Sequence, residues 1–535
     1  MFAVKNVVAR LAGSGFSEPG PPGYASAQRN DSTTFTFSSN ETPSASPNPY
    51  SARAKNRARL HPALWVGVGF VASFVLTAGI ANYTGIRSRS TRPASCDKIA
   101  EFAGESGTRL GPPRTTLAAV GKKRVPGPKE LLSPSAPASS LYDALRPEYR
   151  YLTVDSWSGE VGQFLSAISQ LYLGQQTQRI SIFPSIWRDG EHYGTSAVRP
   201  SDLFDMERFR QETGTLFVEW SDVKPFDRTF SLVKEDDIGC YFSWNGFADG
   251  RSYGDYKVKT TAWSVTRPYG FPGNSVEGLV MFDYDETLRH NLTRQASIET
   301  GRPIPRNMQA SQLICYTNVW AIPRLGVWAP NTFWNGDYKA FDGLQASEGS
   351  MREVLHPSLR GVHPEWWSVG RHIDFTPAVW EVAVLAIQRT LEQDSLPAST
   401  LTVHIRRGDF DHWCPSGHGC VAPLEAYKSA VDALLDDLPD DTVVLVTTDE
   451  TSADFHASIR ALGWYAVHHG KIGTAALLKE RYGESSGWWD SAVDQAILSV
   501  GNAFVGTLDS QVSLVSALRV ASWQNGETRL VHRPT

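Results

Sequence analysis

The stretch LTVHIRRGDF at residues 401–410 changes character in its middle, and this change indicates the fold. Its first half is apolar and β-branched, as in a buried strand, and it stops at two arginines, a glycine and an aspartate. Ligands of an open α/β sheet bind beyond the carboxyl ends of the strands, and arginine's planar fork suits a diphosphate. The stretch therefore predicts a strand that ends in an anion site. An ordinary surface pair of arginine and aspartate is the alternative.

Strands and helices alternate along the chain after this stretch. The spacing of apolar residues predicts a helix over 423–437, and a second β-branched run predicts a buried parallel strand over 442–448. Further helices are expected at 452–462, 489–500 and 510–520, and further strands at 464–468 and 503–507. Such an alternation is typical of a nucleotide-binding α/β domain. The turn GTLDSQV at 506–512 brings backbone N–H groups to a helix N-terminus, which favours phosphate.

Four motifs in this part of the chain resemble the superfamily of GDP-fucose protein O-fucosyltransferases and core α1,6-fucosyltransferases. The motifs are HIRRGD at 404–409, TDE at 448–450, VDQ at 493–495 and the turn at 506–512. The resemblance continues weakly upstream. There, SGEVGQ at 158–163 and RISIFP at 179–184 look like the family's first glycine-rich loop and second strand.

The resemblance implies two facing Rossmann-like domains, the GT-B arrangement. It also implies an inverting transfer of fucose from GDP-fucose to a protein or glycan hydroxyl, with no metal and no other cofactor. Arg406 would hold the β-phosphate and stabilise the charge on the departing GDP. This role is physically sound, because cations that are already in place where negative charge develops lower the barrier most.

The resemblance also assigns the other donor-binding residues. His404 and Arg407 would assist Arg406, and Asp494 would read the guanine edge. The remaining donor-binding candidates are Gly408, Asp409, Asp449 and Gly506, with Thr507, Ser510, Gln511 and Val512 around the phosphates.

The upstream loop supplies the acceptor-side candidates Gly159, Gly162 and Gln163. The family usually carries asparagine where this chain has Gly162, and this difference motivates an alternative: a catalytically silent lumenal relative that binds a GDP-sugar or a glycan. Glu160 is the candidate general base, because a carboxylate in a cleft-facing loop takes the proton of an attacking hydroxyl. The alternative for Glu160 is a first-turn helix glutamate favoured by the helix dipole.

The rest of the chain indicates how these domains are held in the cell. A chain of 535 residues, 41% hydrophobic, has the length for two sizeable cores, and a net charge of −5 argues against a nucleic acid as partner. We expect a disordered cytoplasmic tail at 1–60, a transmembrane signal anchor at 63–86, a stem at 87–141, an acceptor-side Rossmann-like domain at 142–370 and a GDP-sugar-binding domain at 371–535. Basic residues before the anchor favour a single-pass type II protein of the Golgi or ER membrane.

An oxidising lumen would permit disulfides among the five cysteines. The candidate pairs are Cys414 with Cys420, in one loop, and Cys240 with Cys315. Zinc bound by Cys414, Cys420 and the neighbouring histidines is the alternative for that loop. Asn291 begins an N-glycosylation sequon.

Two further stretches have competing interpretations. LVMFDYD at 279–285 ends in Asp283-x-Asp285, the pattern with which metal-dependent GT-A glycosyltransferases hold a divalent cation. Resistance of the activity to EDTA would separate that class from the GT-B reading. Trp366, Trp367 and the apolar helix expected at 375–391 are interpreted as core at the junction of the two domains, with an acceptor platform as the alternative.

Overall fold

The computed structural model describes the folded part of the chain with some gaps. The described residues are 110–112, 124–155, 159–186, 198–226, 233–242, 252–253, 256–264, 276–317, 364–411, 421–482, 488–508 and 510–531. All of them belong to one compact unit, residues 92–535. The predicted tail at 1–60 and anchor at 63–86 lie outside these residues. Within the described ranges, no helix combines the length and the apolar character that a membrane crossing requires.

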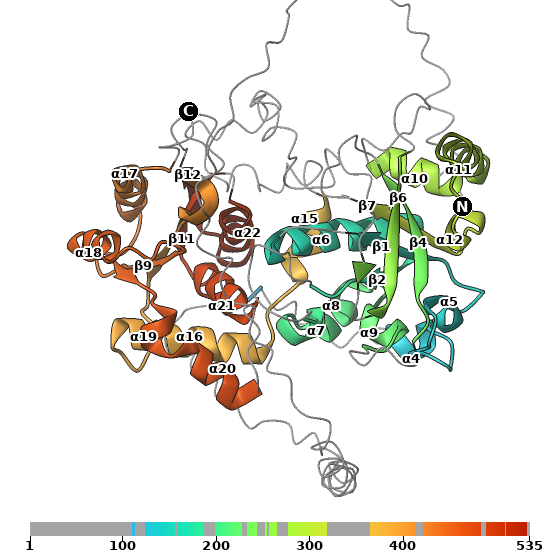
Figure 1. The fold of residues 1–535 in the computed structure, drawn as a ribbon. Helices are drawn as coiled ribbons and strands as arrows, with labels where there is room; N and C mark the ends of the chain where they lie inside the picture. The colour runs from blue at the N-terminus through green and yellow to red at the C-terminus, as the bar shows by residue number, and fades with distance from the viewer. Residues whose placement is uncertain are drawn as a thin grey trace, which may run out of the picture. The chain divides into compact units, whose positions relative to one another are not determined.

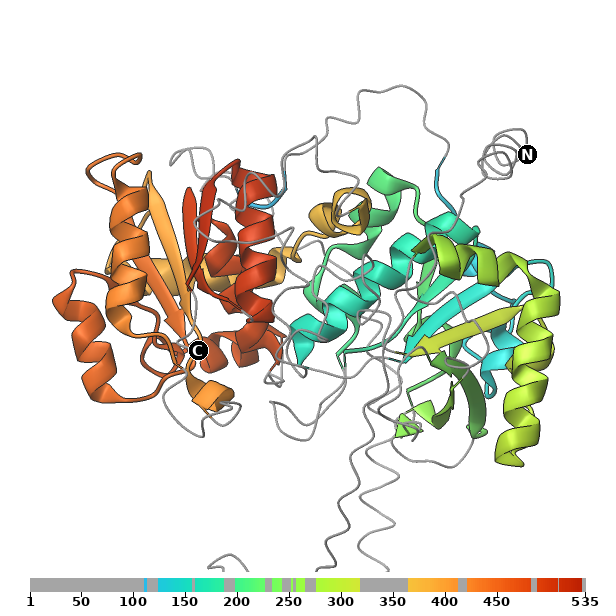
Figure 2. The ribbon, with the colours of Figure 1, turned by 90° about the horizontal axis from the view of Figure 1, so that it is seen from above.

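Among the described residues, the first of two sheets has seven strands in the order β3-β2-β1-β7-β4-β6-β5. Its strands β1, β2, β4, β6 and β7 are labelled in Figure 1, and Figure 2 shows the same ribbon from above. The strands are β1 (Tyr151–Asp155), β2 (Ile180–Phe183), β3 (Phe217–Glu219), β4 (Asp236–Phe242), β5 (Ser252–Tyr253), β6 (Val258–Ser264) and β7 (Leu313–Thr317). Neighbouring strands run parallel, except that β5 is antiparallel to β6. The parallel strands therefore end at one common edge, which is where Asp155 closes β1.

Helices cover both faces of this sheet, because alternate strand residues point to opposite sides. Leu152 and Val154 pack with the helices of one face, and Tyr151 packs with those of the other. The first face carries α6 (Glu160–Thr177), α10 (Val276–Tyr284) and α11 (Glu286–Thr300), and the second carries α4 (Pro128–Leu131), α5 (Leu141–Ala144) and α9 (Trp220–Val223). The short helices α7 (Pro200–Leu203), α8 (Met206–Thr213) and α12 (Arg306–Gln309) complete this region.

The position of α4 and α5 corrects the predicted stem. Leu131 and Leu141 are 2% and 1% exposed, and both belong to the core on the second face of the first sheet. The range 87–141 therefore cannot be a stem along its whole length. The prediction relied on the Pro/Ser-rich composition of this range and overlooked a few leucines that pack against the sheet. Burial of each such side chain favours the folded state by about 1.5–3 kcal/mol.

The second sheet has five parallel strands in the order β10-β9-β8-β11-β12. The strands are β8 (Thr400–Ile405), β9 (Val443–Thr448), β10 (Tyr465–Ala466), β11 (Ala503–Thr507) and β12 (Glu527–Val531). The 401–410 stretch thus supplies the central strand, and its arginines follow the end of that strand. The sequence predicted every strand except β12, and the predicted α/β class with parallel sheets is confirmed.

The helices of the second sheet also divide between two faces. The helices α17 (Leu424–Leu435) and α18 (Ala453–Ala461) pack on one face, and α16 (Pro377–Leu391), α21 (Trp488–Ser499) and α22 (Gln511–Arg519) pack on the other. The remaining elements are α15 (Pro364–Ser368), η6 (Gly370–His372), η7 (Gly408–Asp411), α19 (His469–Ile472), α20 (Thr474–Tyr482) and η8 (Val520–Gln524).

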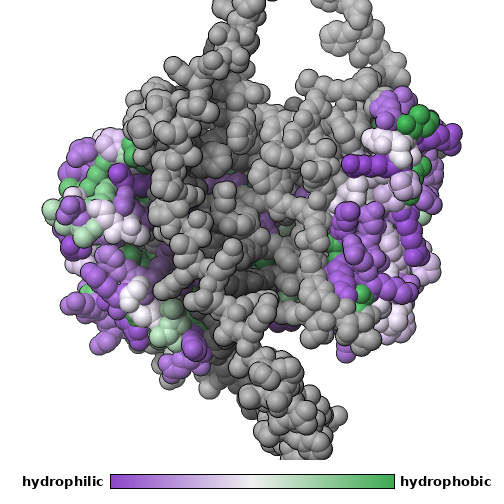
Figure 3. All heavy atoms as spheres, in the orientation of Figure 1, coloured by the Kyte–Doolittle hydropathy of each residue, from purple (hydrophilic) through white to green (hydrophobic). Residues whose placement is uncertain are grey.

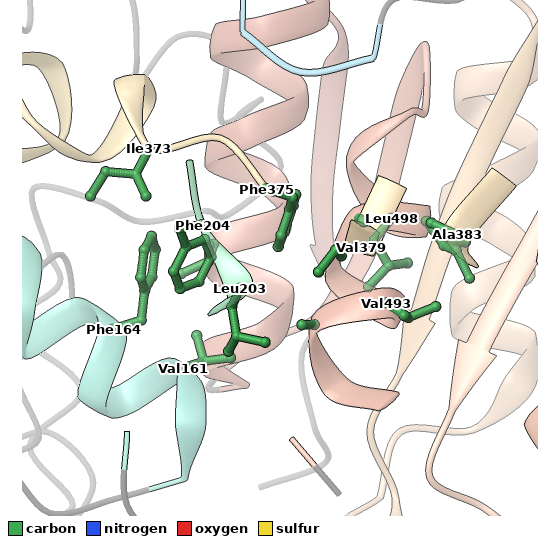
Figure 4. Packing of buried hydrophobic residues seen from close by; sticks show 14 of the residues in the cluster. Val161, Phe164, Leu203, Phe204, Ile373, Phe375, Val379, Ala383, Val493 and Leu498 are labelled. Carbon is green, nitrogen blue, oxygen red and sulfur yellow. The ribbon is translucent and has the colours of Figure 1, made fainter. Parts of the chain in front are cut away.

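One apolar cluster joins the two regions. Val161 and Phe164 of α6 belong to it together with residues of α16 and α21 (Figure 4). The ring centroids of Phe164 and Phe204 lie 4.9 Å apart, and those of Phe204 and Phe375 lie 5.6 Å apart. Trp366 is fully buried in the same cluster. The core interpretation of this tryptophan and of the 375–391 helix is therefore confirmed.

A disulfide joins Cys240 of β4 to Cys315 of β7, one of the two bridges that the sequence predicts. It is buried on the second face of the first sheet.

On the face of the molecule shown in Figure 3, the described residues are mainly hydrophilic, with small separate hydrophobic patches. Met281 and Ile298 are among the large apolar side chains that the described surface exposes.

Candidate functional site

The candidate site begins where β8 ends, at Arg406, Arg407 and Gly408, which we call the arginine loop. Asp449, which directly follows β9, binds this loop through both of its carboxylate oxygens. Its Oδ1 accepts the Arg407 backbone N–H at 2.8 Å, and its Oδ2 accepts Nη1 of Arg406. A Cβ atom on Gly408 would lie 2.3 Å from Asp449 Oδ2. Glycine is therefore required for the carboxylate to reach the loop.

Both arginine side chains are held by several contacts and remain partly exposed. Arg407 Nε donates to Glu450 Oε2 at 3.1 Å, and its guanidinium lies 4.5 Å from the ring centroid of Phe455. The side chains of Arg406 and Arg407 are 20% and 25% exposed. Two carboxylates that directly follow β9, Asp449 and Glu450, thus fix both cations at the edge of the sheet.

Thr507, at the end of β11, connects the arginine loop to the core. Its Oγ1 accepts the Arg406 backbone N–H at 2.8 Å and donates to the His404 carbonyl at 3.2 Å. The Tyr427 hydroxyl lies 2.7 Å from the same oxygen. Because Thr507 is fully buried, its hydroxyl supports the loop and does not face the solvent as a phosphate ligand would. Tyr427 was missed as a site residue, since its spacing indicated only an apolar helix position.

His404 is a neutral supporting residue. Burial, and then the charge of Arg406, lower the pKa of His404 to about 3. Its Nδ1 lies 2.7 Å from Ser513 Oγ, and this oxygen also accepts the Thr507 backbone N–H at 2.9 Å. The Ser513 hydroxyl thus connects the His404 ring to the end of β11. Ser513 carries no motif that would have identified it.

The N-terminus of α22 lies beside the arginine loop. Ser510 caps the helix by accepting the Ser513 backbone N–H, and Gln511 and Val512 form its first turn. A Cβ atom on Gly506 would lie 2.7 Å from the Ser513 Cβ, so glycine is what allows β11 and α22 to approach. The positive end of a helix and two arginines converge here, and an anion such as a diphosphate fits both.

Asp494, the expected guanine reader, lies on α21. Its Oδ1 accepts from Nε2 of His469 at 2.9 Å, and its side chain is 26% exposed. Its charge opposes the lowering of the His404 pKa, which places it near the strand that carries the arginine loop.

Glu160 does not face a cleft. It is the first residue of α6, after the N-cap Gly159, and only 2% of it is exposed. Gln495 Nε2 lies 3.1 Å from each of its carboxylate oxygens. Burial raises the pKa of Glu160 to about 7. This placement is the one expected for a first-turn helix glutamate, and Gly162 and Gln163 are buried in the same turn.

Arg519, at the end of α22, completes this buried group. Its Nη1 donates to Gln495 Oε1 at 3.0 Å, and its guanidinium lies 4.3 Å from the Phe375 ring centroid and 5.1 Å from that of Phe164. Burial lowers the pKa of Arg519 to about 9. Glu160, Gln495 and Arg519, which we call the junction triad, thus connect α6 with α21 and α22. No motif marked Arg519, because it falls inside an ordinary helical pattern.

The Asp-x-Asp pattern is used for structural contacts. The apolar run before it is the helix α10. Asp283 is buried and accepts from Arg150 Nη2 and Arg179 Nε, each at 2.7 Å. Asp285 caps α11 by accepting the Leu288 backbone N–H at 2.8 Å. Both carboxylates therefore have structural partners, and the described part of the chain contains no group of three histidine, cysteine or acidic side chains placed to hold a metal.

The other predicted residues are placed as follows. Asn291 is exposed on α11, while Thr293 of its sequon is buried and bonds Tyr241 at 3.1 Å. Asp409 lies in the turn η7. Cys414 and Cys420 lie outside the described residues.

The sequence matches no family model and no curated protein. Several solved structures are similar to the chain. The crystal structure of the protein O-fucosyltransferase POFUT1 with GDP-fucose is 12% identical, with a TM-score of 0.40, over 72% of this chain and 99% of that one. The NodZ α1,6-fucosyltransferase co-crystallised with GDP is 12% identical, with a TM-score of 0.32, over 70% and 93%. NodZ from Bradyrhizobium is 13% identical, with a TM-score of 0.31, over 70% and 94%. Each of these three solved structures is a fucosyltransferase.

Proposed function

We propose that the chain is a fucosyltransferase of the GT-B arrangement, which moves fucose from GDP-fucose to a protein or glycan hydroxyl without a metal. The observation that carries this proposal is the arginine loop. Asp449 clamps two partly exposed arginines beside the N-terminus of α22. This arrangement suits the diphosphate of a nucleotide sugar, and the similar POFUT1 and NodZ structures hold GDP-fucose or GDP.

The chemistry follows from where charge develops. The acceptor oxygen forms a bond to C1 of fucose while the bond from C1 to the phosphate oxygen breaks, so that GDP leaves with the electron pair. Arg406, Arg407 and the N–H groups of α22 stabilise the new charge on the diphosphate. They need little rearrangement, because Asp449 and Thr507 already fix the loop. The acceptor's proton passes to a base, and the buried Glu160 would take this role only after it leaves Gln495.

The cellular setting is part of the same proposal. A signal anchor at 63–86 would hold the protein in the Golgi or ER membrane as a single-pass type II protein, with its catalytic part in the lumen. The Cys240–Cys315 bridge supports an oxidising compartment, because disulfides persist there.

Calorimetry on the full chain in mild detergent tests the donor. GDP, GDP-fucose, GDP-mannose and UDP-glucose are titrated with and without EDTA, into wild type, Arg406→Ala and the control Arg529→Ala, which removes an exposed arginine from β12. We expect guanine nucleotides to bind wild type and the control regardless of EDTA, with a loss of about 10- to 100-fold in the affinity of Arg406→Ala. Binding of UDP-glucose alone, or binding only with a divalent ion, would overturn the proposal.

Two observations favour a second candidate, a donor-binding protein without transfer. Gly162 offers no side chain to the acceptor, and Glu160 is engaged by Gln495. Incubation with GDP-fucose and mixed glycan and peptide acceptors separates the two candidates. Release of GDP and fucose transfer support the enzyme, whereas tight binding with neither supports the silent relative.

A further inference from the structure

His469 is held by hydrogen bonds through both of its ring nitrogens. Nε2 lies 2.9 Å from Asp494 Oδ1, and Nδ1 lies 2.9 Å from Oγ1 of Thr474. Thr474 begins α20 and is fully buried, so it is a fixed partner. Two bonds to separate helices leave the imidazole ring a single orientation.

The imidazole also faces a second carboxylate of α21. Asp490 precedes Asp494 by one helical turn and acts on the charge of His469. Asp490 Oδ1 is buried and has no hydrogen-bond partner within the described ranges. Burial alone would lower the pKa of His469, but the two carboxylates, Asp494 foremost, raise it to about 9. At neutral pH, therefore, the His469 ring is protonated, and it donates a hydrogen bond to Asp494 while it also interacts with the charge of Asp490.

Only one oxygen of Asp494 is used by this contact. Oδ1 accepts from His469, while Oδ2 has no partner in the described part of the chain and the side chain is partly exposed. A free carboxylate on a helix surface would sample several rotamers, at a cost in entropy when a ligand fixes one of them. The contact with His469 removes most of that freedom before a ligand binds.

We propose that His469 is a positioning residue for nucleotide recognition: it orients Asp494 so that this carboxylate accepts from the N1–H and the 2-amino group of a guanine base. The inference rests on the proposed function, because it assumes a guanine nucleotide at the arginine loop. It adds that base selectivity depends on a histidine that does not touch the nucleotide. Selectivity for the base and affinity for the diphosphate are then separate properties of the site.

The test compares three probes on the full chain by calorimetry: GDP, inosine diphosphate, which lacks the 2-amino group, and inorganic pyrophosphate. The variants are His469→Ala, His469→Gln, whose amide is able to donate to Asp494 without carrying charge, and His290→Ala, a control at an exposed histidine of α11. In His469→Ala we expect GDP affinity to fall about tenfold and its preference over inosine diphosphate to shrink, with pyrophosphate binding unchanged. His469→Gln should recover part of the preference, and His290→Ala should match wild type.

The outcomes separate this inference from the proposed function. If wild type prefers GDP and the His469→Ala variant keeps that preference, the positioning role is wrong while the proposed function stands. If His469→Ala weakens GDP and pyrophosphate by the same factor, the histidine supports the fold and the inference is likewise wrong. If wild type binds neither GDP nor inosine diphosphate, the proposed function itself fails.

Discussion

Arg406 and Arg519 lie near opposite ends of the same helix and show two uses of one side chain. Arg406 is beside the N-terminus of α22, and Arg519 is the last residue of this helix. The helix rises by about 12 Å between its first and its last residue. Arg406 is partly exposed and paired with Asp449, while Arg519 is fully buried among aromatic rings. The first can meet a ligand, whereas the second can only hold α6 against α21 and α22.

Burial and hydrogen-bond partners distinguish a binding arginine from a structural one. Burial lowers the pKa of Arg519 because the surroundings disfavour its charge, and Nε and Nη2 of this residue have no hydrogen-bond partner in the described ranges. Such a group costs stability unless its partners stay in place. Arg406, by contrast, is held by carboxylate and backbone contacts at a sheet edge that an anion can approach.

Removal of Arg519 should have the largest effect. Arg519→Ala leaves Glu160 without the cation that opposes its desolvation and opens a cavity between Phe164 and Phe375. We expect the free energy of unfolding to fall by about 3–5 kcal/mol, measured by urea denaturation. Arg519→Met, which refills the space, should lose less. Equal losses in the two variants would show that charge, not packing, dominates the junction triad.

Removal of Arg406 should affect the ligand and spare the fold. Arg406→Ala should weaken GDP binding by about 10- to 100-fold, since it removes charge-assisted contacts to the diphosphate. Its free energy of unfolding should stay within about 1 kcal/mol of wild type, because a partly exposed ion pair contributes little. An equal loss in the free energy of unfolding in Arg406→Ala and Arg519→Ala would contradict the distinction between a binding and a structural arginine.

The pH dependence of stability should report on Glu160. Burial raises its pKa from 4.5 to about 7, so the stabilisation from binding this proton is complete below pH 4.5 and disappears as the pH rises through about 7. Glu160→Gln keeps a neutral acceptor for Gln495. Urea denaturation between pH 4.5 and 8 should therefore show the variant gaining stability relative to wild type as the pH rises, with a plateau above about 8. A constant difference would mean that Glu160 does not titrate in this range.

Removal of divalent ions should have the smallest effect. Asp283 is bound by Arg150 and Arg179, so EDTA should leave GDP binding and any transfer activity unchanged. Asp283→Asn should instead lower the melting temperature, because it leaves the buried Arg179 poorly paired. A loss of GDP binding in EDTA, recovered with Mn²⁺, would contradict this assignment.

Local patterns predicted most of the second sheet and much of the candidate site. The β-branched run before Arg406 predicted the central strand β8, and the Asp449 motif fell beside it because neighbouring parallel strands end at one edge. The edge strand β12 was missed, since its alternation is short. The run before Asp283 is a helix, which a short apolar stretch cannot distinguish from a strand.

By itself, the sequence determined the α/β class, the order of the C-terminal elements and the place of the arginine loop. These features depend on residues that are near each other in the chain, such as the apolar run and the glycine that follows it. Three contacts follow only from the packed chain: Glu160 lies buried against Gln495, Thr507 contacts the arginine loop from the core, and His469 contacts Asp494. Each of these contacts joins residues from different elements, and burial, which sets their charge and their access to a ligand, is a property of the packed chain and not of any segment.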